Sequence, residues 1–194
     1  MRPDRAALDG AIEHVLAAPS DRARIEFLCN RPNFGVRNFT DRLKVTRAGG
    51  VENCRWTKHP WMKLEDGSPD PRIQVCIIPR RVLDLVWRED ESGGTHPGDT
   101  FAADMNMSLD AMPTGTLLRA GTAVLQVSDV WNNACTKWKA RYGEDALNWV
   151  RENEDLRLRG VLCCVVEDGV LENGSTIERL THRNGHINSM ESAI

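Results

Sequence analysis

Hydrophobic and polar positions first mark out helices along this chain. Apolar residues recur at positions 7, 8, 11, 12, 15 and 16, a three- and four-residue spacing that predicts a helix closed by Pro19. The segments 80–90, RRVLDLVWRED, and 143–160, GEDALNWVRENEDLRLRG, show the same type of spacing. The sequence therefore predicts one helix near the start of the chain, one in the middle and one late.

Short apolar or alternating runs bounded by turn residues predict β-strands between these helices. The runs expected to form strands are ARIEFLC (23–29), RLKVT (42–46), RIQVCIIP (72–79), LLRAGTAVLQVSDV (117–130) and VLCCVVEDGVLENGSTIERL (161–180). Between them, residues 57–72 contain three prolines and are expected to form a loop. Many short strands with few helices favour a mainly β fold, a closed or nearly closed barrel with helices at its rim, because closure removes exposed strand edges.

Composition limits the class of protein without selecting a function. The chain has 194 residues, 41% of them hydrophobic and 27% charged, with a net charge of −3, which is typical of one globular domain. We expect this domain at 20–180, after the N-terminal helix at 1–19 and before a polar tail at 181–194. Basic residues are scattered, so no nucleic-acid partner is expected. No apolar run approaches the ~20 residues needed to span a membrane, and a signal peptide is not apparent, which favours the cytoplasm.

Cys135 differs from the other cysteines in its neighbours. The six cysteines include no C-x-x-C pair, and Cys76, Cys163 and Cys164 lie in apolar runs where a free thiol acts as a small hydrophobe. Cys135 instead lies in SDVWNNACTKWKARYG (128–143), among asparagines, tryptophans and positive charges. Exposure and nearby positive charge favour the thiolate, the form that attacks an electrophile or ligates a metal.

Few other residues stand out as candidates for chemistry. His59 and His96 lie in proline-containing loops and could reach a pocket. Arg55, Arg72 and Arg159 each stand where a loop meets a strand, and a guanidinium group there can bind phosphate or carboxylate through two parallel hydrogen bonds. No common catalytic or nucleotide-binding motif is present.

The order of several segments resembles the MOSC family, the domain found at the C-terminus of molybdenum-cofactor sulfurases. The likeness covers roughly residues 20 to 180 and is strongest to the short, standalone bacterial members. The segments that carry it are GGVENCRW, PRIQVCIIPRRVLDLV, PGDTFAAD, MPTGTLLRAGTAVLQVSDVWNNACTKW, RYGEDALNWV and RLRGVLCCVVEDGVLENGSTI.

This resemblance implies a pyruvate-kinase-type β-barrel with a cleft and one functional cysteine, at the position of Cys135. In the family this cysteine is thought to carry sulfur or to bind the metal of a pterin cofactor, and a thiolate suits both tasks. Together with the hypotheses below, this makes Cys135, Asp99 and His96 the candidate catalytic residues, with Cys135 also as the metal ligand. The residues expected to hold a molybdenum cofactor (molybdopterin) are Arg55, Arg72, Arg159, Thr100, Asn133 and Lys137.

Three departures from the family pattern fall on expected cleft positions. An acid is replaced in Asn53-Cys54-Arg55, an amide becomes a hydroxyl in Gly98-Asp99-Thr100, and Asn132-Asn133 stand before the cysteine where relatives often have histidine or proline. These departures leave three hypotheses for the function. The first is an enzyme that handles sulfur or a molybdenum-pterin cofactor through Cys135.

The second hypothesis is a cofactor-free enzyme that uses Cys135 as nucleophile or general acid on a small sulfur- or nitrogen-containing molecule, with Asp99 or His96 accepting a proton. The third is a binding or accessory protein without catalysis. The first two expect a small-molecule substrate, the third a ligand or a partner, and a homodimer is compatible with all of them. Metal and pterin content, thiol reactivity and a Cys135→Ser variant distinguish them.

Overall fold

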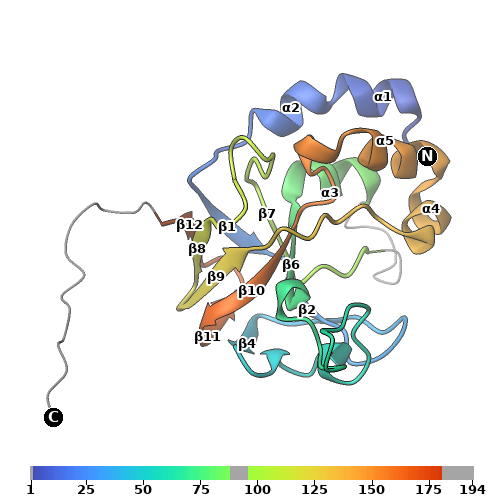
Figure 1. Ribbon diagram of the computed structural model, residues 1–194. Helices are drawn as coiled ribbons and strands as arrows, with labels where there is room; N and C mark the ends of the chain where they lie inside the picture. Colours follow the sequence, from blue (N-terminus) through green and yellow to red (C-terminus); the bar gives the residue numbers. More distant parts are fainter. Residues whose placement is uncertain (1, 88–95, 181–194) are drawn as a thin grey trace, which may run out of the picture.

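Seven strands close into a mixed β-barrel in the computed structural model, which describes residues 2–87 and 96–180 (Figure 1). Neighbouring strands around the barrel are antiparallel except β6 and β7, which are parallel. Around the barrel the strands are β1 (Arg22–Glu26), β12 (Thr176–Arg179), β8 (Leu117–Ala120), β9 (Ala123–Val127), β10 (Val161–Glu167), β6 (Val75–Pro79) and β7 (Phe101–Ala103). The expected mainly β barrel with peripheral helices is confirmed.

Two small sheets extend the barrel on one side. The first consists of β11 (Gly169–Glu172), β4 (Arg42–Thr46) and β5 (Gly50–Val51), and the second pairs β2 (Cys29–Asn30) with β3 (Asn38–Phe39). β2 continues β1 along the chain after a short break, so its end lies close to the start of β7: the N–H of Cys29 donates to the carbonyl of Thr100. This connection brings a polar loop against the end of the barrel.

The helices pack on the outside of the barrel, as the ribbon shows (Figure 1). They are α1 (Arg5–Gly10), α2 (Ile12–Leu16), α3 (Arg80–Val86), α4 (Thr136–Tyr142) and α5 (Glu144–Glu152). The expected N-terminal helix is present but is divided at Ala11, and the expected late helix ends at Glu152 and is followed by the 3-10 turn η3 (Glu154–Leu156). α4 was not expected as a helix.

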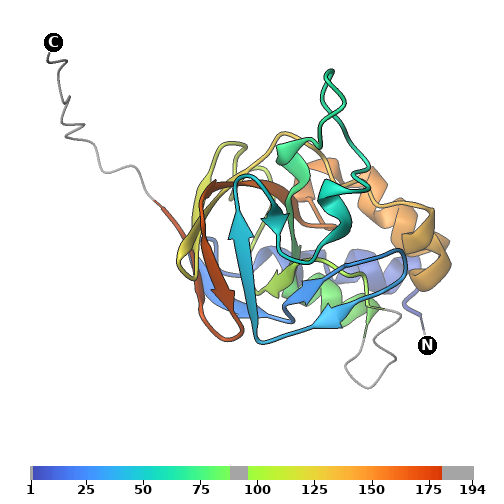
Figure 2. The ribbon, with the colours of Figure 1, turned by 90° about the horizontal axis from the view of Figure 1, so that it is seen from below.

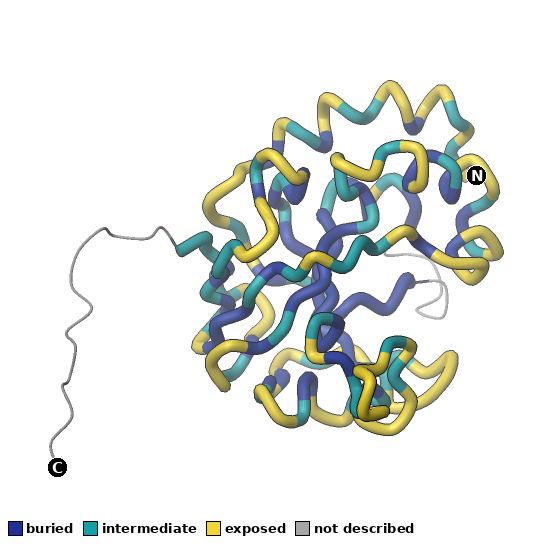
Figure 3. The backbone as a smooth tube through the Cα atoms, in the orientation of Figure 1, coloured by how far each residue is buried: buried dark blue, intermediate teal, exposed yellow. Residues whose placement is uncertain are grey.

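Buried residues form one core inside the barrel, another between the barrel and the helices, and a small third cluster of Trp56, Ile73, Cys76 and Leu162 (Figure 3). β6 belongs to both cores, because Ile77 points into the first and Ile78 into the second. This explains why the run 75–79 is apolar throughout, with all five of its residues buried. β6 is therefore held in position by side chains of the barrel on one face and of the helices on the other.

The segment 57–72 is mostly loop, as expected from its prolines. It runs from η1 (Arg55–Thr57) to η2 (Pro71–Ile73), and part of it projects from the body of the molecule (Figure 2). At its base Trp56 Nε1 donates to the carbonyl of Asp70 at 3.2 Å. Of the boundaries expected from the sequence, the tail 181–194 lies outside the described residues. None of the helices in the described ranges is long and apolar enough to cross a membrane.

Candidate anion-binding site

A buried ion pair lies where β7 and β10 begin. Nη1 of Arg159 is 2.6 Å from Oδ1 of Asp99, and the two side chains are only 11% and 1% exposed. The sulfur of Cys76, on β6, donates to the same oxygen at 2.7 Å. The ring of Trp138 lies under the guanidinium group, 4.7 Å from its Cζ. Cys76 on β6 and Arg159 just before β10 therefore converge on the Asp99 carboxylate, and Trp138 of α4 packs against the guanidinium group.

The charges of this pair stabilise each other against burial. Burial by itself raises the pKa of Asp99, but the adjacent Arg159 and the hydrogen bonds from Arg159 and Cys76 leave that pKa below its usual value. For Arg159, burial opposes the charge while Asp99 favours it, and the net pKa is raised. Burial, followed by the charge of Asp99, raises the pKa of Cys76 well above its usual value. At neutral pH the cluster is therefore a carboxylate, a guanidinium and a neutral thiol.

Four more arginines lie near this pair. Arg37 interacts electrostatically with Arg31 and Arg141, and Arg55 with Arg31. Burial, followed by these neighbouring positive charges, lowers the pKa values of Arg37 and Arg55. A Cβ placed on Gly98, next to Asp99, would lie 3.0 Å from Nε of Arg37 and 3.3 Å from Cδ of Arg31. Arg31 also interacts electrostatically with Asp99, so it links Arg37 and Arg55 to the buried pair, and Asp99 is the one carboxylate of the described residues that forms an ion pair with any of these five arginines.

Most of the hydrogen-bonding capacity of these arginines is not used within the part of the chain that the structure describes. Nε of Arg37 and Nε of Arg55 are buried without a hydrogen-bond partner there. The guanidinium groups of Arg31 and Arg141 form no hydrogen bond or ion pair with residues of 2–87 or 96–180. Excess positive charge with unused N–H donors is the condition for binding an anion.

His96 lies in an aromatic cage beside the arginines. Its ring centroid is 4.8 Å from that of Trp87 and 5.0 Å from that of Phe39, both in edge-on contacts. Burial lowers the pKa of His96 to about 4, against the opposing charge of Asp99. Its Nδ1 accepts a hydrogen bond from the N–H of Gly98 at 3.0 Å, so the proton of the neutral ring is assigned to Nε2. His96 is therefore an uncharged hydrogen-bond donor at neutral pH.

Cys135 is exposed and directly precedes α4. Its carbonyl accepts hydrogen bonds from the N–H groups of Trp138 and Lys139, whereas its sulfur has no hydrogen-bond partner in the described ranges. The same helix carries Trp138, under Arg159, and Arg141, beside Arg37. α4 therefore links the thiol to the arginine cluster, although no direct contact joins the sulfur to an arginine in the described part of the chain.

The remaining cysteines are less available for reaction. Burial raises the pKa of Cys29 to about 11 and also raises those of Cys76 and Cys163, both in the barrel wall. Burial raises the pKa of the half-buried Cys164 as well. Cys54 is half-buried and packs against the apolar cores. Cys135 is the one described cysteine in the exposed class.

Two of the expected cofactor-binding residues are engaged in contacts that hold the fold. The hydroxyl of Thr100 accepts a hydrogen bond from the N–H of Cys76 at 3.1 Å, which ties β7 to β6. Arg72 pairs with the fully buried Asp70 at 2.7 Å and with the exposed Asp129 at 3.2 Å, and so fastens the end of the loop 57–72. Both side chains already have strong internal partners.

The other expected residues lie closer to the site. Lys137 and Arg55 approach the same ring, Phe34, with Nζ and Cζ at 5.5 and 4.6 Å from its centroid. Asn133 is exposed, and its carbonyl accepts a hydrogen bond from Arg151. The structure therefore brings together four of the expected residues, namely Arg55, His96, Asp99 and Arg159.

Sequence reasoning missed several residues of this site. The missed residues are Asn30, Arg31, Arg37, Cys76, Trp138 as a support for Arg159, and Arg141. Asn132, an expected cleft position, donates from Nδ2 to the sulfur of Cys76 and to the carbonyl of Arg159. Arg31 and Arg37 lie in a loop without any periodic pattern, so their convergence depends on the pairing of β2 with β3. The one available signal was the position of Arg31 directly after an apolar strand-like run, which is the same criterion that selected Arg55 and Arg159.

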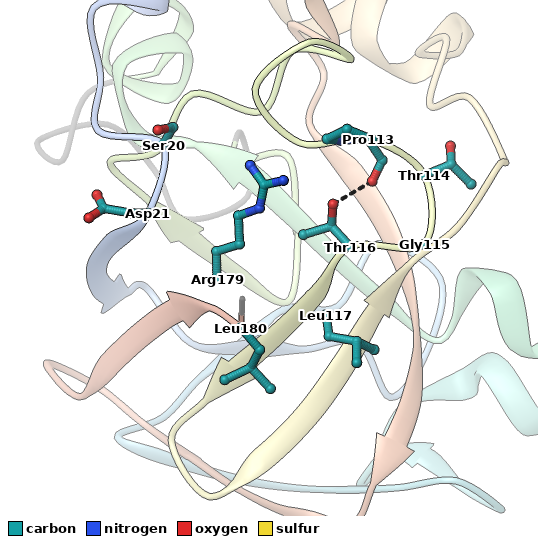
Figure 4. A pocket seen from close by; sticks show the side chains of 9 residues that line it. All are labelled: Ser20, Asp21, Pro113, Thr114, Gly115, Thr116, Leu117, Arg179 and Leu180. Atoms are coloured by element: carbon teal, nitrogen blue, oxygen red, sulfur yellow. Dashed lines mark hydrogen bonds between the residues drawn. The ribbon is translucent and has the colours of Figure 1, made fainter. Parts of the chain in front are cut away.

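A separate cavity lies at another part of the barrel. It has a volume of about 560 Å³, and its lining residues are shown in Figure 4. Arg179 enters this region, but its Nη1 donates to the carbonyl of Ala111 at 2.7 Å. None of the arginines of the anion-binding site lines the cavity. No group of three or more metal-binding side chains occurs in the described residues, either here or at the arginines.

Comparison with solved structures identifies the fold. The YuaD protein from Bacillus subtilis superimposes with a TM-score of 0.59 at 16% identity, over 81% of this chain and 95% of that one. YiiM from Escherichia coli gives 0.55 at 17% identity over 82% and 70% of the two chains, and YiiM from Geobacillus stearothermophilus gives 0.51 at 14% over 84% and 75%. No family model and no curated protein matches the sequence.

YuaD and YiiM are MOSC-domain proteins, so the barrel of this chain has a MOSC-like fold, as the order of its sequence segments predicts. At such low sequence identity the superpositions establish a similar fold only, and the function has to be argued from the residues of this chain.

Proposed function

We propose that this protein is a small-molecule enzyme that binds an anionic ligand at the arginine cluster and uses Cys135 as a sulfur carrier or metal ligand. One observation carries the first part of the proposal: five arginines lie close enough to interact electrostatically, one of them is paired with the buried Asp99, and two others have buried Nε–H groups without a partner in the described chain. Burial of several like charges is unfavourable unless an opposite charge joins them. An anion supplies that charge and accepts the unused hydrogen bonds.

The molybdenum-pterin cofactor is the anionic ligand that the MOSC-like fold suggests, and the donor set fits its phosphate group. Arg31, Arg37, Arg55 and Arg141 would hold the phosphate through charge-assisted hydrogen bonds. Because no cluster of three metal-binding side chains occurs in the described residues, the metal would arrive with the pterin. When bound, the cofactor would supply a redox-active metal centre. Cys135 is the exposed thiol that could ligate it.

The position of Cys135 also supports a role without the cofactor. An exposed thiol at the start of α4 can carry sulfur or attack a small electrophile, whereas the other thiols are buried or half-buried. Lys137 and Arg141 follow on the same helix and could attract an anionic substrate toward it. Analysis of freshly purified protein for molybdenum and pterin, after expression with molybdate, decides between the two forms of the proposal.

Anion binding is tested by titration calorimetry with inorganic phosphate. We expect the unmodified protein to bind phosphate, and Arg37→Met and Arg55→Met each to weaken binding at least ~10-fold, because each removes a charged donor. Arg24→Met is the matched control, since Arg24 is exposed on β1 and forms no ion pair within the described residues. Equal affinities for all four proteins, or no binding by any, would refute the anion site.

The role of Cys135 is tested by limited alkylation with iodoacetamide followed by peptide mapping. We expect Cys135 to be modified first and Cys76 and Cys163 last, and saturating phosphate to change the rate at Cys135 because α4 joins both parts of the site. The Cys135→Ser variant should lose sulfur transfer or metal retention while still binding phosphate. Full activity in that variant would exclude Cys135 from the chemistry.

A further inference from the structure

The two oxygens of the Asp99 carboxylate have different surroundings. Oδ1 accepts hydrogen bonds from Nη1 of Arg159 at 2.6 Å and from Sγ of Cys76 at 2.7 Å. Oδ2 is equally buried, yet it has no hydrogen-bond partner within residues 2–87 and 96–180. A buried carboxylate oxygen without a donor is costly, since burial removes its hydration without replacing it. A hydrogen-bond donor from outside the described residues, such as a ligand, would therefore stabilise this oxygen.

Asn30 provides a second acceptor of the same kind. The residue is 7% exposed, and its Oδ1 is buried without a partner in the described segments. β2 places it near Asp99, because the N–H of Cys29 bonds to the carbonyl of Thr100 at 2.9 Å. The two unpaired acceptors, Oδ1 of Asn30 and Oδ2 of Asp99, thus lie on two segments that are hydrogen-bonded to each other.

Unpaired donors lie on the same segments. Nε2 of His96, which carries the proton of the neutral ring, and Nε of Arg37 are both buried without a partner in the described chain. Gly98 lies between His96 and Asp99 in the sequence, and the side chain of Arg37 packs against it. Its φ of +81°, and the 3.0 Å that would separate an added Cβ from Nε of Arg37, leave no room for a larger residue. The unpaired donors of His96 and Arg37 and the unpaired oxygen of Asp99 therefore lie on segments that meet at Gly98.

From this arrangement we infer that Asp99 is a specificity-determining residue, which selects oxyanions that carry a proton of their own over oxyanions that carry none. The inference rests on the proposed anion binding and adds the protonation state of the anion: a phosphate monoester, whose second pKa is about 6, would bind in its singly protonated form. A protonated oxyanion accepts hydrogen bonds from the arginines and donates one to Oδ2 of Asp99. A fully deprotonated oxyanion offers only lone pairs, so it faces the negative charge of Asp99 without a hydrogen bond between them.

Repulsion of this type is an efficient source of specificity. Rejection of a wrong ligand depends on a clash or an unpaired polar group as much as on good contacts with the right one. A buried site that needs a hydrogen bond from its ligand discriminates strongly against analogues that lack the donor, often by more than ~100-fold. The arginines alone would not discriminate, because they contact only oxygen atoms that both types of anion possess.

Four tetrahedral oxyanions of similar size provide the test. At neutral pH phosphate and arsenate keep a proton, whereas sulfate and selenate do not. Titration calorimetry on the unmodified protein should show phosphate and arsenate binding at least ~10-fold more tightly than sulfate and selenate. If all four bind alike, the anion site stands and selection by Asp99 is refuted. If none binds, the proposed anion site itself fails, and the inference falls with it.

The Asp99→Asn variant assigns the selection to this residue. Loss of the negative charge should raise the affinity for sulfate and bring the phosphate-to-sulfate ratio at least ~10-fold closer to one. The exposed Asp110→Asn is the matched control and should keep the ratio of the unmodified protein. Thermal unfolding confirms that each variant is folded before its titration. If Asp99→Asn does not fold, the pairwise comparison of the four anions on the unmodified protein still decides the inference, and an unchanged ratio in folded Asp99→Asn would overturn it.

Discussion

Nη1 of Arg159 and Oδ1 of Asp99 lie 2.6 Å apart in the interior of the protein, although 60 residues separate them in the sequence. Arg159 lies two residues before the start of β10, and Asp99 lies two residues before the start of β7. The contact connects the barrel wall with the anion-binding site, because Asp99 also accepts the hydrogen bond from Cys76 on β6. Disruption of this pair should therefore affect both stability and binding.

Loss of one member should cost much more than loss of both. Arg159→Met leaves the buried carboxylate of Asp99 without its counter-charge, and we expect the free energy of unfolding to fall by about 3–5 kcal/mol. The double variant Arg159→Met/Asp99→Asn should recover a large part of this loss, because it removes the unpaired charge. Urea denaturation followed by circular dichroism measures both effects.

The control for this comparison is an exposed ion pair of the same type. Arg42 and Glu172 are 3.5 Å apart, with side chains 70% and 60% exposed. Arg42→Met should change stability by less than about 1 kcal/mol, since water already screens that pair. Similar losses in Arg159→Met and Arg42→Met would show that the buried pair has no special role.

His96 makes stability dependent on pH in a defined window. Its pKa in the folded protein is lowered to about 4 from a usual value of 6.5, so between these values the unfolded chain binds a proton that the folded protein does not. Stability should therefore be complete above pH 6.5 and fall as the pH drops to about 4, by up to roughly 3 kcal/mol. The lowered pKa of Asp99 acts at still lower pH, below the usual value of 3.8.

Urea denaturation at a series of pH values checks this prediction. His96→Asn removes the titrating ring and should flatten the dependence of stability on pH across that window. The exposed His59→Asn is the control and should leave the dependence unchanged. A slope in His96→Asn equal to that of the unmodified protein would assign the effect to other groups.

Local patterns in the sequence predicted most of the barrel, but not β7, because its three residues, Phe101–Ala103, were not among the runs expected to form strands. The β8–β9 hairpin follows from alternating apolar residues on both sides of Gly121, whose φ of +56° suits a tight turn. The run 75–79 predicted β6, because a short run that is apolar at every position is typical of a strand buried on both faces. These patterns involve only residues that are adjacent in the sequence, so they can be recognised without the tertiary structure.

The site was predicted only in part, because it is assembled by contacts between distant segments. α4 has only two buried side chains, Trp138 and Tyr142, and a window of seven residues gave too little periodicity to predict a helix. Their four-residue spacing was the available signal. Cys76 was interpreted as a hydrophobe, since its run is apolar, but its sulfur bonds to Asp99 across the barrel wall. Nothing local in the run indicates that partner.

Gly160 should be the least replaceable glycine near the site. It adopts a φ of +83°, and a Cβ built on it would lie 1.9 Å from the carbonyl oxygen of Ile77 on β6. Relief of that clash requires β10 to move away from β6 and would displace the adjacent Arg159. We expect Gly160→Ala to lower the free energy of unfolding by more than about 4 kcal/mol, or to prevent folding.

A variant at Gly174 distinguishes the cost of this clash from the cost of placing alanine in a left-handed backbone conformation. It has a similar φ of +79°, but no atom lies within 4 Å of its Cβ position. Gly174→Ala should therefore cost only the ~1–2 kcal/mol of the left-handed conformation. Urea denaturation of both variants measures the difference, and phosphate titration should show intact binding in Gly174→Ala. Equal destabilisation of the two would mean that β10 can move from β6 at little cost, and hence that the position of Arg159 does not depend on this contact.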